Sequence, residues 1–254
     1  TGEPFFCYVT PNAPHGPLDC PPGSDAAPLA RLEAAGIGTP KQRADIAKFY
    51  GMIENIDTNV GKLLRKLDDL GIADDTIVVF TTDNGTATGQ SVFNDGMRGA
   101  KGSPWRGGTR VPSFWRWRGT LPAGMDVPAV TAHIDVLPTL VDLAGGKQPP
   151  TLGKSLVPAF AKDRAIEREA IFFHHLDNRA IRVGDWKLVA AAKEPWELYD
   201  LTHDYSEAHD LAAERSDVVA RLEGILDREH VPDPAWPMPF AAKDRVSASS
   251  GGRV

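Results

Sequence analysis

The sequence has little cysteine and no long apolar run, and each absence excludes a class of protein. Two cysteines, Cys7 and Cys20, among 254 residues are too few for a disulfide framework or a cysteine-ligated zinc site. No segment reaches the roughly 18 consecutive apolar residues of a membrane span, and no signal peptide is recognisable. Internal repeats are absent as well. We therefore expect neither a disulfide-stabilised module nor a protein that spans a membrane.

An excess of basic charge is also missing. The net charge is −6 and the sequence pI is about 5.6. The most arginine-dense stretch, residues 106–118, alternates with Trp and Pro and does not form the basic stripe of a nucleic-acid-binding surface. Hydrophobic residues at 42% and charged residues at 24% are typical of an ordinary globular protein. We expect no nucleic-acid partner.

Apolar spacing predicts an α/β fold. Residues 42–70 carry apolar side chains at helical spacing, and Gly71 is a suitable end for that helix. Residues 77–80 form a continuous apolar run, which predicts a strand covered on both faces, as in a mostly parallel sheet flanked by helices. The other predictions here are strands over 4–10 (with Cys7 in the core) and 111–117, loops over 18–40 and 85–110, and a helix over 136–144 with Asp135 as its N-cap.

The pattern changes beyond residue 165. Short strands are predicted at 170–174, 179–183, 186–191 and 196–199, followed by a helix over 214–229. Such closely spaced strands indicate a small antiparallel sheet. We therefore predict three parts: an α/β core over 1–160, a small C-terminal α+β subdomain over 161–240, and a flexible tail over 241–254.

Three polar positions could carry chemistry. Asp83 and Asn84 follow the strand at 77–80 and offer hard oxygen ligands for calcium or magnesium, although an Asx turn that ends a strand has the same pattern. His15 follows the first predicted strand and could donate a proton, or could be an ordinary surface histidine. Lys101 lies between glycines and could hold an anion, or could be a solvated charge.

The order of the motifs is more specific than any one of them. NAPHGP, a long helix, VVFTTDNG, GAKGSPWRGGTRVP and HIDVLPTLVDLAG follow one another, and NRAIRVGDWKLV and WELYDLTHDYSEAHDLA come later. Together they resemble the formylglycine-dependent sulfatases of the alkaline-phosphatase-like superfamily, over about residues 4–228. The resemblance implies a metal-assisted sulfuric ester hydrolase of the arylsulfatase type.

The resemblance also implies a role at each position. Asp83 and Asn84 match two ligands of the active-site calcium, for which magnesium is the alternative. His15 matches the histidine that contacts the sulfate ester and protonates the leaving oxygen, and Lys101 matches the lysine that binds a sulfate oxygen. His174 stands where some members place a substrate-contacting histidine, with an exposed strand end as the alternative interpretation.

Some family features differ or are absent. Arg106 replaces the acidic residue of the usual W-E-G-G loop. The C-x-[PA]-x-R signature, whose cysteine becomes formylglycine, and the N-terminal Asp pair of the metal site are not found. Cys20 begins a similar stretch, but Ser24 occupies the arginine position, so we interpret it as a coincidence.

These differences lead to the expectation that the chain is the C-terminal portion of a longer protein, inactive by itself, whose missing N-terminal half supplies the nucleophile. Its substrate is expected to be a sulfated small molecule or a sulfated glycan. Family habit predicts a periplasmic or secreted location. Two alternatives remain open: a phosphate or phosphonate ester hydrolase of the same superfamily, and a non-catalytic protein that keeps only the fold.

Overall fold

The computed structural model describes residues 2–160 and 166–229, which belong to two compact units. The first unit covers Thr1–Phe80, Ala87–Asn94 and Phe114–Ala123, and the second covers Thr81–Thr86, Asp95–Ser113 and Gly124–Val254. The predicted domain division at residue 160 stays a prediction, and the predicted tail at 241–254 lies outside the described residues. No helix in the described ranges is long and apolar enough to cross a membrane.

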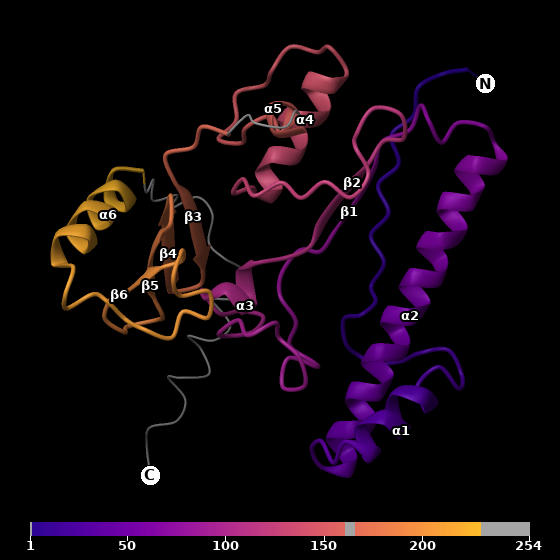
Figure 1. Ribbon diagram of the computed structural model, residues 1–254, viewed down its shortest axis with the longest axis horizontal. Coiled ribbons are helices and arrows are strands. Elements are labelled where there is room, and N and C mark those ends of the chain that lie inside the picture. The colour runs from indigo at the N-terminus through magenta and orange to yellow at the C-terminus, as the bar shows by residue number, and fades with distance from the viewer. Residues whose placement is uncertain (1, 161–165, 230–254) are drawn as a thin grey trace, which may run out of the picture. The chain divides into compact units, whose positions relative to one another are not determined.

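The first unit is built around the long helix α2, Pro40–Asp69, which confirms the predicted helix. Thr39 caps its start: Gln42 N donates to Thr39 Oγ1 at 3.3 Å, and Thr39 N donates to Gln42 Oε1 at 2.8 Å. The helix ends before Gly71, whose φ of +67° is the left-handed conformation that glycine adopts readily. Figure 1 shows the shorter helix α1, Ala26–Ala34, beside the N-terminal part of α2.

The prediction of a loop over 18–40 was wrong where α1 lies. The helix contains strong helix formers, and its Pro28 stands in the first turn, where a missing N–H group does little harm. Leu32 of α1 packs with Ile46 and Ala47 of α2 in a small core. The surrounding proline and glycine residues concealed this short helix from an analysis of the sequence alone.

The predicted strand over 4–10 was also wrong. Residues 2–10 have no strand assignment in the described structure, and Phe6 and Tyr8 are 79% and 80% exposed. Cys7 is exposed as well, so it is not a core residue. The apolar composition is that of a strand, but a strand forms only where its backbone pairs with another, and the described residues supply no such partner here.

Two short strands, β1 Val78–Thr81 and β2 Ser113–Arg116, form a two-stranded sheet at the predicted positions. The prediction that the first of them is covered on both faces is not met among the described residues, because Val78, Val79 and Phe80 are only half-buried. The rings of Phe80 and Phe114 face each other at 6.4 Å between centroids, while Phe114 remains 65% exposed.

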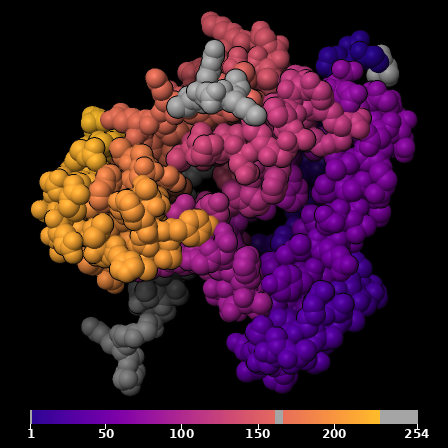
Figure 2. All heavy atoms as spheres, in the orientation of Figure 1, coloured from indigo at the N-terminus to yellow at the C-terminus, as the bar shows by residue number. Residues whose placement is uncertain are grey.

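The predicted antiparallel sheet of the C-terminal part is confirmed. It consists of β3 Ile171–His175, β4 Asn178–Val183, β5 Trp186–Ala190 and β6 Glu197–Asp200, in the spatial order β3-β4-β5-β6. The predicted helix is also confirmed as α6, Ser216–Glu229. Figure 1 shows α6 beside this sheet, and Figure 2 shows the atoms of the sheet and of α6, in orange and yellow, closely packed.

Both faces of the four-stranded sheet are packed at its centre: successive side chains point to opposite sides, and each side has its own packing partners. One face packs against Val218, Leu222 and Leu226 of α6 and consists of Ile181, Leu188 and Leu198. The other face contains Ala180, Val189 and Tyr199 together with Phe173 of β3, and it packs against Trp105. The sheet therefore stands between a helix and the loop that contains Trp105.

The remaining helical elements are short: α3 Arg106–Thr109, the 3-10 turn η1 His133–Asp135, α4 Val136–Leu143 and α5 Val157–Phe160. The predicted helix at 136–144 is thus present and Asp135 occupies its N-cap position, but the Asp135 side chain makes no capping hydrogen bond to it. The fully buried carboxylate instead accepts hydrogen bonds from Ala132 N at 2.7 Å, Lys154 N at 2.8 Å and the Arg168 guanidinium. It joins three segments, a role that local spacing cannot reveal.

Candidate active site

Asp83 and Asn84 lie directly after β1, as the sequence predicts. Thr81 Oγ1 donates to the Pro112 carbonyl oxygen at 2.9 Å, which holds the end of the strand to the segment before β2. Asp83 is exposed and Asn84 is half-buried, and Asn84 Nδ2 donates to Asp83 Oδ2 at 2.5 Å. The two polar side chains are therefore adjacent at an accessible strand end.

The lysine loop, defined here as residues 98–108, is joined to this strand end by two backbone hydrogen bonds. Gly85 N donates to the Gly108 carbonyl oxygen at 3.0 Å, and Lys101 N donates to the Thr86 carbonyl oxygen at 3.0 Å. Lys101 is exposed. The structure thus brings together the segments of three predicted site residues, namely Asp83, Asn84 and Lys101.

Glycine is required where the two segments meet. A Cβ atom built on Gly85 would lie 1.8 Å from the Gly107 carbonyl oxygen, and one built on Gly108 would lie 2.2 Å from the Ser103 carbonyl oxygen. Both obstacles are backbone atoms, so a side-chain rotation cannot remove them. This close approach explains in physical terms why glycine follows Asp83-Asn84 and why glycine stands at position 108.

His133 is a neighbour of this strand end that the sequence analysis did not single out. Its Nε2 donates to the carbonyl oxygen of Thr82 at 2.7 Å, one residue before Asp83. The motif HIDVLPTLVDLAG was used for the family resemblance and for a helix prediction, but no role was given to its histidine. A histidine three residues before the predicted helix was the available signal.

His15 belongs to the first unit and is exposed on the proline-rich loop, as predicted. Its Nδ1 donates to the Gly16 carbonyl oxygen at 2.8 Å. Because a carbonyl oxygen can only accept, Nδ1 carries the hydrogen and Nε2 is the basic nitrogen of the neutral ring. The other predicted site residues lie in the second unit, so the role of His15 stays a prediction.

His174 is exposed on β3, opposite Arg179 of β4. The neighbouring His175 lies closer to the lysine loop: its Cε1 would be 3.9 Å from a Cβ atom built on Gly102. Asn178, at the start of β4, donates from Nδ2 to the Gly102 carbonyl oxygen at 3.0 Å. The β3–β4 hairpin therefore contacts the residue next to Lys101, while a substrate role for His174 stays a prediction.

Charged and aromatic side chains attach the lysine loop to the sheet. Arg98 pairs with Glu197 of β6 at 3.1 Å, and its guanidinium carbon stands 4.2 Å from the centroid of the Trp105 ring. Trp105 Nε1 donates to Glu197 Oε2 at 2.9 Å. Tyr199 donates to the same oxygen at 2.8 Å, and burial together with this carboxylate raises the pKa of Tyr199 above its usual range.

Arg106, which replaces the usual acidic residue, does not point a free charge at the site. Its guanidinium carbon lies 4.2 Å from the centroid of the Tyr205 ring, and its Nη1 donates to the Tyr205 carbonyl oxygen at 3.3 Å. Burial lowers the pKa of Arg106 from its usual value. Tyr205 is held in turn by Arg110, whose Nη1 donates to the hydroxyl at 2.8 Å, and by Asp95. The substitution is thus accommodated by an aromatic partner.

The donor chemistry at the strand end suits a hard divalent cation, but the number of donors is small. Asp83 and Asn84 provide a carboxylate and an amide oxygen, the ligand types that calcium and magnesium prefer. Calcium takes about six to eight oxygens. Within residues 2–160 and 166–229, no group of three or more His, Cys, Asp or Glu side chains could hold a metal ion. Asp83 and Asn84 therefore fit a part of a coordination shell.

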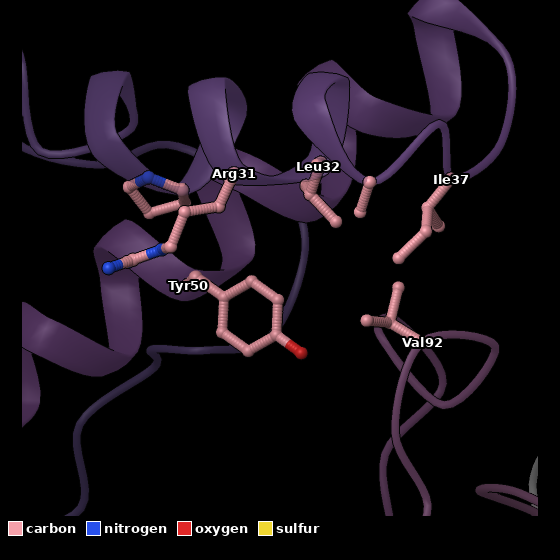
Figure 3. Close-up of a pocket in the computed structure, with 7 residues that line it drawn as sticks. Arg31, Leu32, Ile37, Tyr50 and Val92 are labelled. Carbon is pink, nitrogen blue, oxygen red and sulfur yellow. The ribbon is translucent and has the colours of Figure 1, made fainter.

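An apolar pocket of about 330 Å³ lies elsewhere, in the first unit. Figure 3 shows Leu32, Ile37 and Val92 close to the Tyr50 ring, with Arg31 on the other side. None of the five predicted site residues lines it. Its apolar lining is unsuited to a sulfate ester, so we do not assign the site to it.

Comparisons with known proteins place these residues in a family. The sulfatase family profile matches residues 1–146, and the profile described as N-sulphoglucosamine sulphohydrolase, C-terminal, matches residues 105–230. The N-acetylgalactosamine-6-O-sulfatase of Bacteroides thetaiotaomicron is 30% identical, over 89% of this chain and 47% of that protein.

Two solved structures extend the likeness. Ps i-CgsB is 28% identical with a TM-score of 0.80, over 98% of this chain and 55% of that one. The phosphonate monoester hydrolase of Agrobacterium radiobacter is 27% identical with a TM-score of 0.54, over 81% of this chain and 48% of that one. The chain thus spans about half the length of these relatives. Because the sulfatase profile covers more than half of it, the chain belongs to the sulfatase family and has that family's alkaline-phosphatase-like α/β fold.

Proposed function

We propose that the protein containing this chain hydrolyses sulfate esters and that the chain supplies part of its active site. The observation that carries the proposal is the pair of backbone hydrogen bonds joining the strand end of Asp83 and Asn84 to the lysine loop. A pair of hard oxygen ligands and an ammonium group on connected segments suit a negatively charged tetrahedral group.

Each residue has a chemical task in this proposal. Asp83 and Asn84 would hold a calcium ion, or magnesium as the alternative, and the bound cation would offset the charge of the sulfate group. Lys101 would donate to a sulfate oxygen and stabilise the charge that develops during cleavage. His15 would protonate the leaving oxygen from Nε2 of its protonated ring, because Nδ1 is directed at the Gly16 carbonyl oxygen.

The remaining parts of the active site would come from outside this chain. The formylglycine nucleophile and the other metal ligands would be supplied by an additional N-terminal segment of the natural protein. A sulfated glycan is the favoured substrate class, because the relatives include an N-acetylgalactosamine-6-O-sulfatase. We also propose export to the periplasm or beyond.

The test uses the protein purified from its natural source and 4-nitrophenyl sulfate as substrate. Removing the charge with Lys101→Ala should lower kcat by roughly 100- to 1,000-fold, the usual effect of losing one charge-stabilising donor. Lys154→Ala is the matched control, because Lys154 is also an exposed lysine of the second unit but lies outside the site. Equal activity of both variants and the unchanged protein would refute the role of Lys101.

The metal and the missing segment have separate tests. Chelation should abolish hydrolysis, calcium should restore it, and Asp83→Ala should raise the calcium concentration needed. An intact mass well above the 27.4 kDa of this chain, with a C-x-[PA]-x-R peptide, is expected for the natural protein. The 254-residue chain by itself should show neither hydrolysis nor tight calcium binding, because two protein ligands are too few.

Phosphonate or phosphate ester hydrolysis is the second candidate, favoured by the likeness to the Agrobacterium radiobacter enzyme. A cation, a histidine and a lysine can bind either kind of tetrahedral anion. Turnover of 4-nitrophenyl sulfate should exceed that of the matched phosphate monoester and phenylphosphonate ester. The reverse order would replace the first proposal with the second.

A further inference from the structure

A buried ion pair lies between the sheet and the lysine loop. Lys187 Nζ of β5 and Glu207 Oε1 are 2.6 Å apart, and their side chains are 3% and 0% exposed. The second carboxylate oxygen, Oε2, accepts the backbone N–H of Arg106 at 2.5 Å. One carboxylate therefore connects a central strand of the sheet to the C-terminal part of the lysine loop.

The loop is held on the sheet at its other end as well. Arg98 binds Glu197, and it donates to the Tyr199 hydroxyl and to the Glu207 carbonyl oxygen. Lys101 stands between these two attachments. Its backbone N–H binds Thr86, so the loop has defined contacts on both the sheet side and the strand-end side.

A buried ion pair is an unfavourable way to gain stability alone. Transferring two charges from water to the protein interior carries a desolvation cost that the burial of an apolar pair of similar size does not. A buried ion pair can therefore often be replaced by an apolar pair without loss of stability. Burial lowers the pKa of Lys187 from its usual value, which reflects this cost. What an apolar pair cannot provide is an oxygen atom for the Arg106 N–H group.

We propose that Glu207 is a positioning residue: held by Lys187, it fixes the lysine loop through the Arg106 N–H group and so orients Lys101 toward the substrate. The orientation of the loop follows from the contacts within the second unit. The consequence for Lys101 rests on the sulfate-ester hydrolysis proposed above. Glu207 itself does not touch the substrate in this proposal.

Two double variants separate positioning from stability. Lys187→Met with Glu207→Gln removes the ion pair but keeps a side-chain oxygen that can accept the Arg106 N–H group. Lys187→Met with Glu207→Leu also removes the ion pair, and it leaves that N–H group without its acceptor. Both avoid an unpaired buried charge, so both are expected to fold, and they differ mainly in the bond to the loop.

Activity and hydrogen exchange are measured on both double variants of the natural protein. With 4-nitrophenyl sulfate, the Leu-containing variant should lose about 10- to 100-fold in kcat relative to the Gln-containing variant, because a displacement of about 1 Å can cost that much. Hydrogen–deuterium exchange of peptides covering residues 98–108 should be about tenfold faster in the Leu-containing variant, while β4 and β5 remain protected.

Asp210→Asn serves as the control for a purely structural effect. Asp210 lies in the same connecting segment as Glu207 and accepts hydrogen bonds from Leu198 N and Ala212 N, both at 2.9 Å. Both of these donors lie outside the lysine loop. This variant should melt at a lower temperature without a change in kcat or in exchange over residues 98–108.

The outcomes distinguish this proposal from the proposed function. If the two double variants show equal exchange over residues 98–108, Glu207 does not position the loop, whatever the activity. If exchange differs but kcat does not, the link from the loop to Lys101 is refuted. If the unchanged protein hydrolyses no sulfate ester, the proposed function fails, while the exchange measurement still decides whether Glu207 fixes the loop.

Discussion

Replacement of Gly85 by alanine tests whether the close approach of two backbones builds the site. The alanine Cβ atom would lie 1.8 Å from the Gly107 carbonyl oxygen, more than 1 Å short of the 3.0 Å limit that real Cβ contacts respect. Since the obstacle is backbone, the lysine loop and the strand end must separate by about that distance. The hydrogen bonds donated by Gly85 N and Lys101 N are both 3.0 Å long, and this separation would stretch them beyond hydrogen-bonding distance.

The size of the effect follows from these contacts. Each lost backbone hydrogen bond destabilises the protein by about 1 kcal/mol. Adding the local strain of an overpacked position, we expect Gly85→Ala to lower the free energy of unfolding by about 2 to 4 kcal/mol. The same displacement should lower kcat by about 100-fold, because moving the segment of Lys101 by about 1 Å relative to the strand end can cost that much.

The assay combines thermal unfolding of the natural protein with hydrolysis of 4-nitrophenyl sulfate. Gly224→Ala is the matched control: Gly224 is exposed inside α6, and a Cβ atom there would meet nothing within 4 Å. This control should be stabilised by about 0.5 to 1 kcal/mol, because alanine favours the helix. A Gly85→Ala protein as stable and as active as its Gly224→Ala counterpart would show that the two segments do not meet as described.

Two further predictions concern the second unit. Leu222→Ala should lower the free energy of unfolding by about 2 to 5 kcal/mol in urea, because Leu222 is 0% exposed; the half-exposed Leu63→Ala should change it by less than about 0.5 kcal/mol, and equal losses would contradict this core. Burial alone would raise the pKa of Asp204, but hydrogen bonds from the backbone N–H groups of His209 and Ala208 lower it below 3.8. The carboxylate therefore stabilises the fold above about pH 3.8 and loses this effect as the pH falls through its folded pKa. The stability advantage over Asp204→Asn should shrink in that range, and a constant difference in melting temperature between pH 2.5 and 6 would be evidence against it.

The sequence predicted best those elements whose side chains repeat with a fixed period. The apolar spacing of α2 and the short apolar runs of β3 to β6 reflect local backbone geometry, so no knowledge of distant contacts was needed. The same criterion failed for residues 4–10, which have the composition of a strand but lack a partner among the described residues. It also missed α1, whose helix is short and is stabilised by packing on α2.

In the candidate site, too, some residues could be identified from the sequence and others only from the structure. Asp83, Asn84, Lys101 and His15 could be chosen from the sequence because their residue types and order resemble those of a family. Lys187, Glu207 and Trp105 also stand in the quoted motifs, but their supporting roles could not be assigned, because their contacts form only in the folded chain. Lys187 and Glu207 are 20 residues apart, and Trp105 donates to a carboxylate 92 residues away.

By itself, the sequence determined the positions of α2, of α6 and of the strands β3 to β6, the absence of an overall basic charge, and the chemical groups offered at the end of β1. Only the tertiary structure decided that the strand end and the lysine loop touch, and that a buried carboxylate connects this loop to the sheet. The physical reason is that helices and strands are encoded by short-range periodicity. The contacts at Gly85 and Glu207, in contrast, depend on the close packing of segments that are distant in the chain. The local sequence of one such segment does not indicate which other segment it contacts.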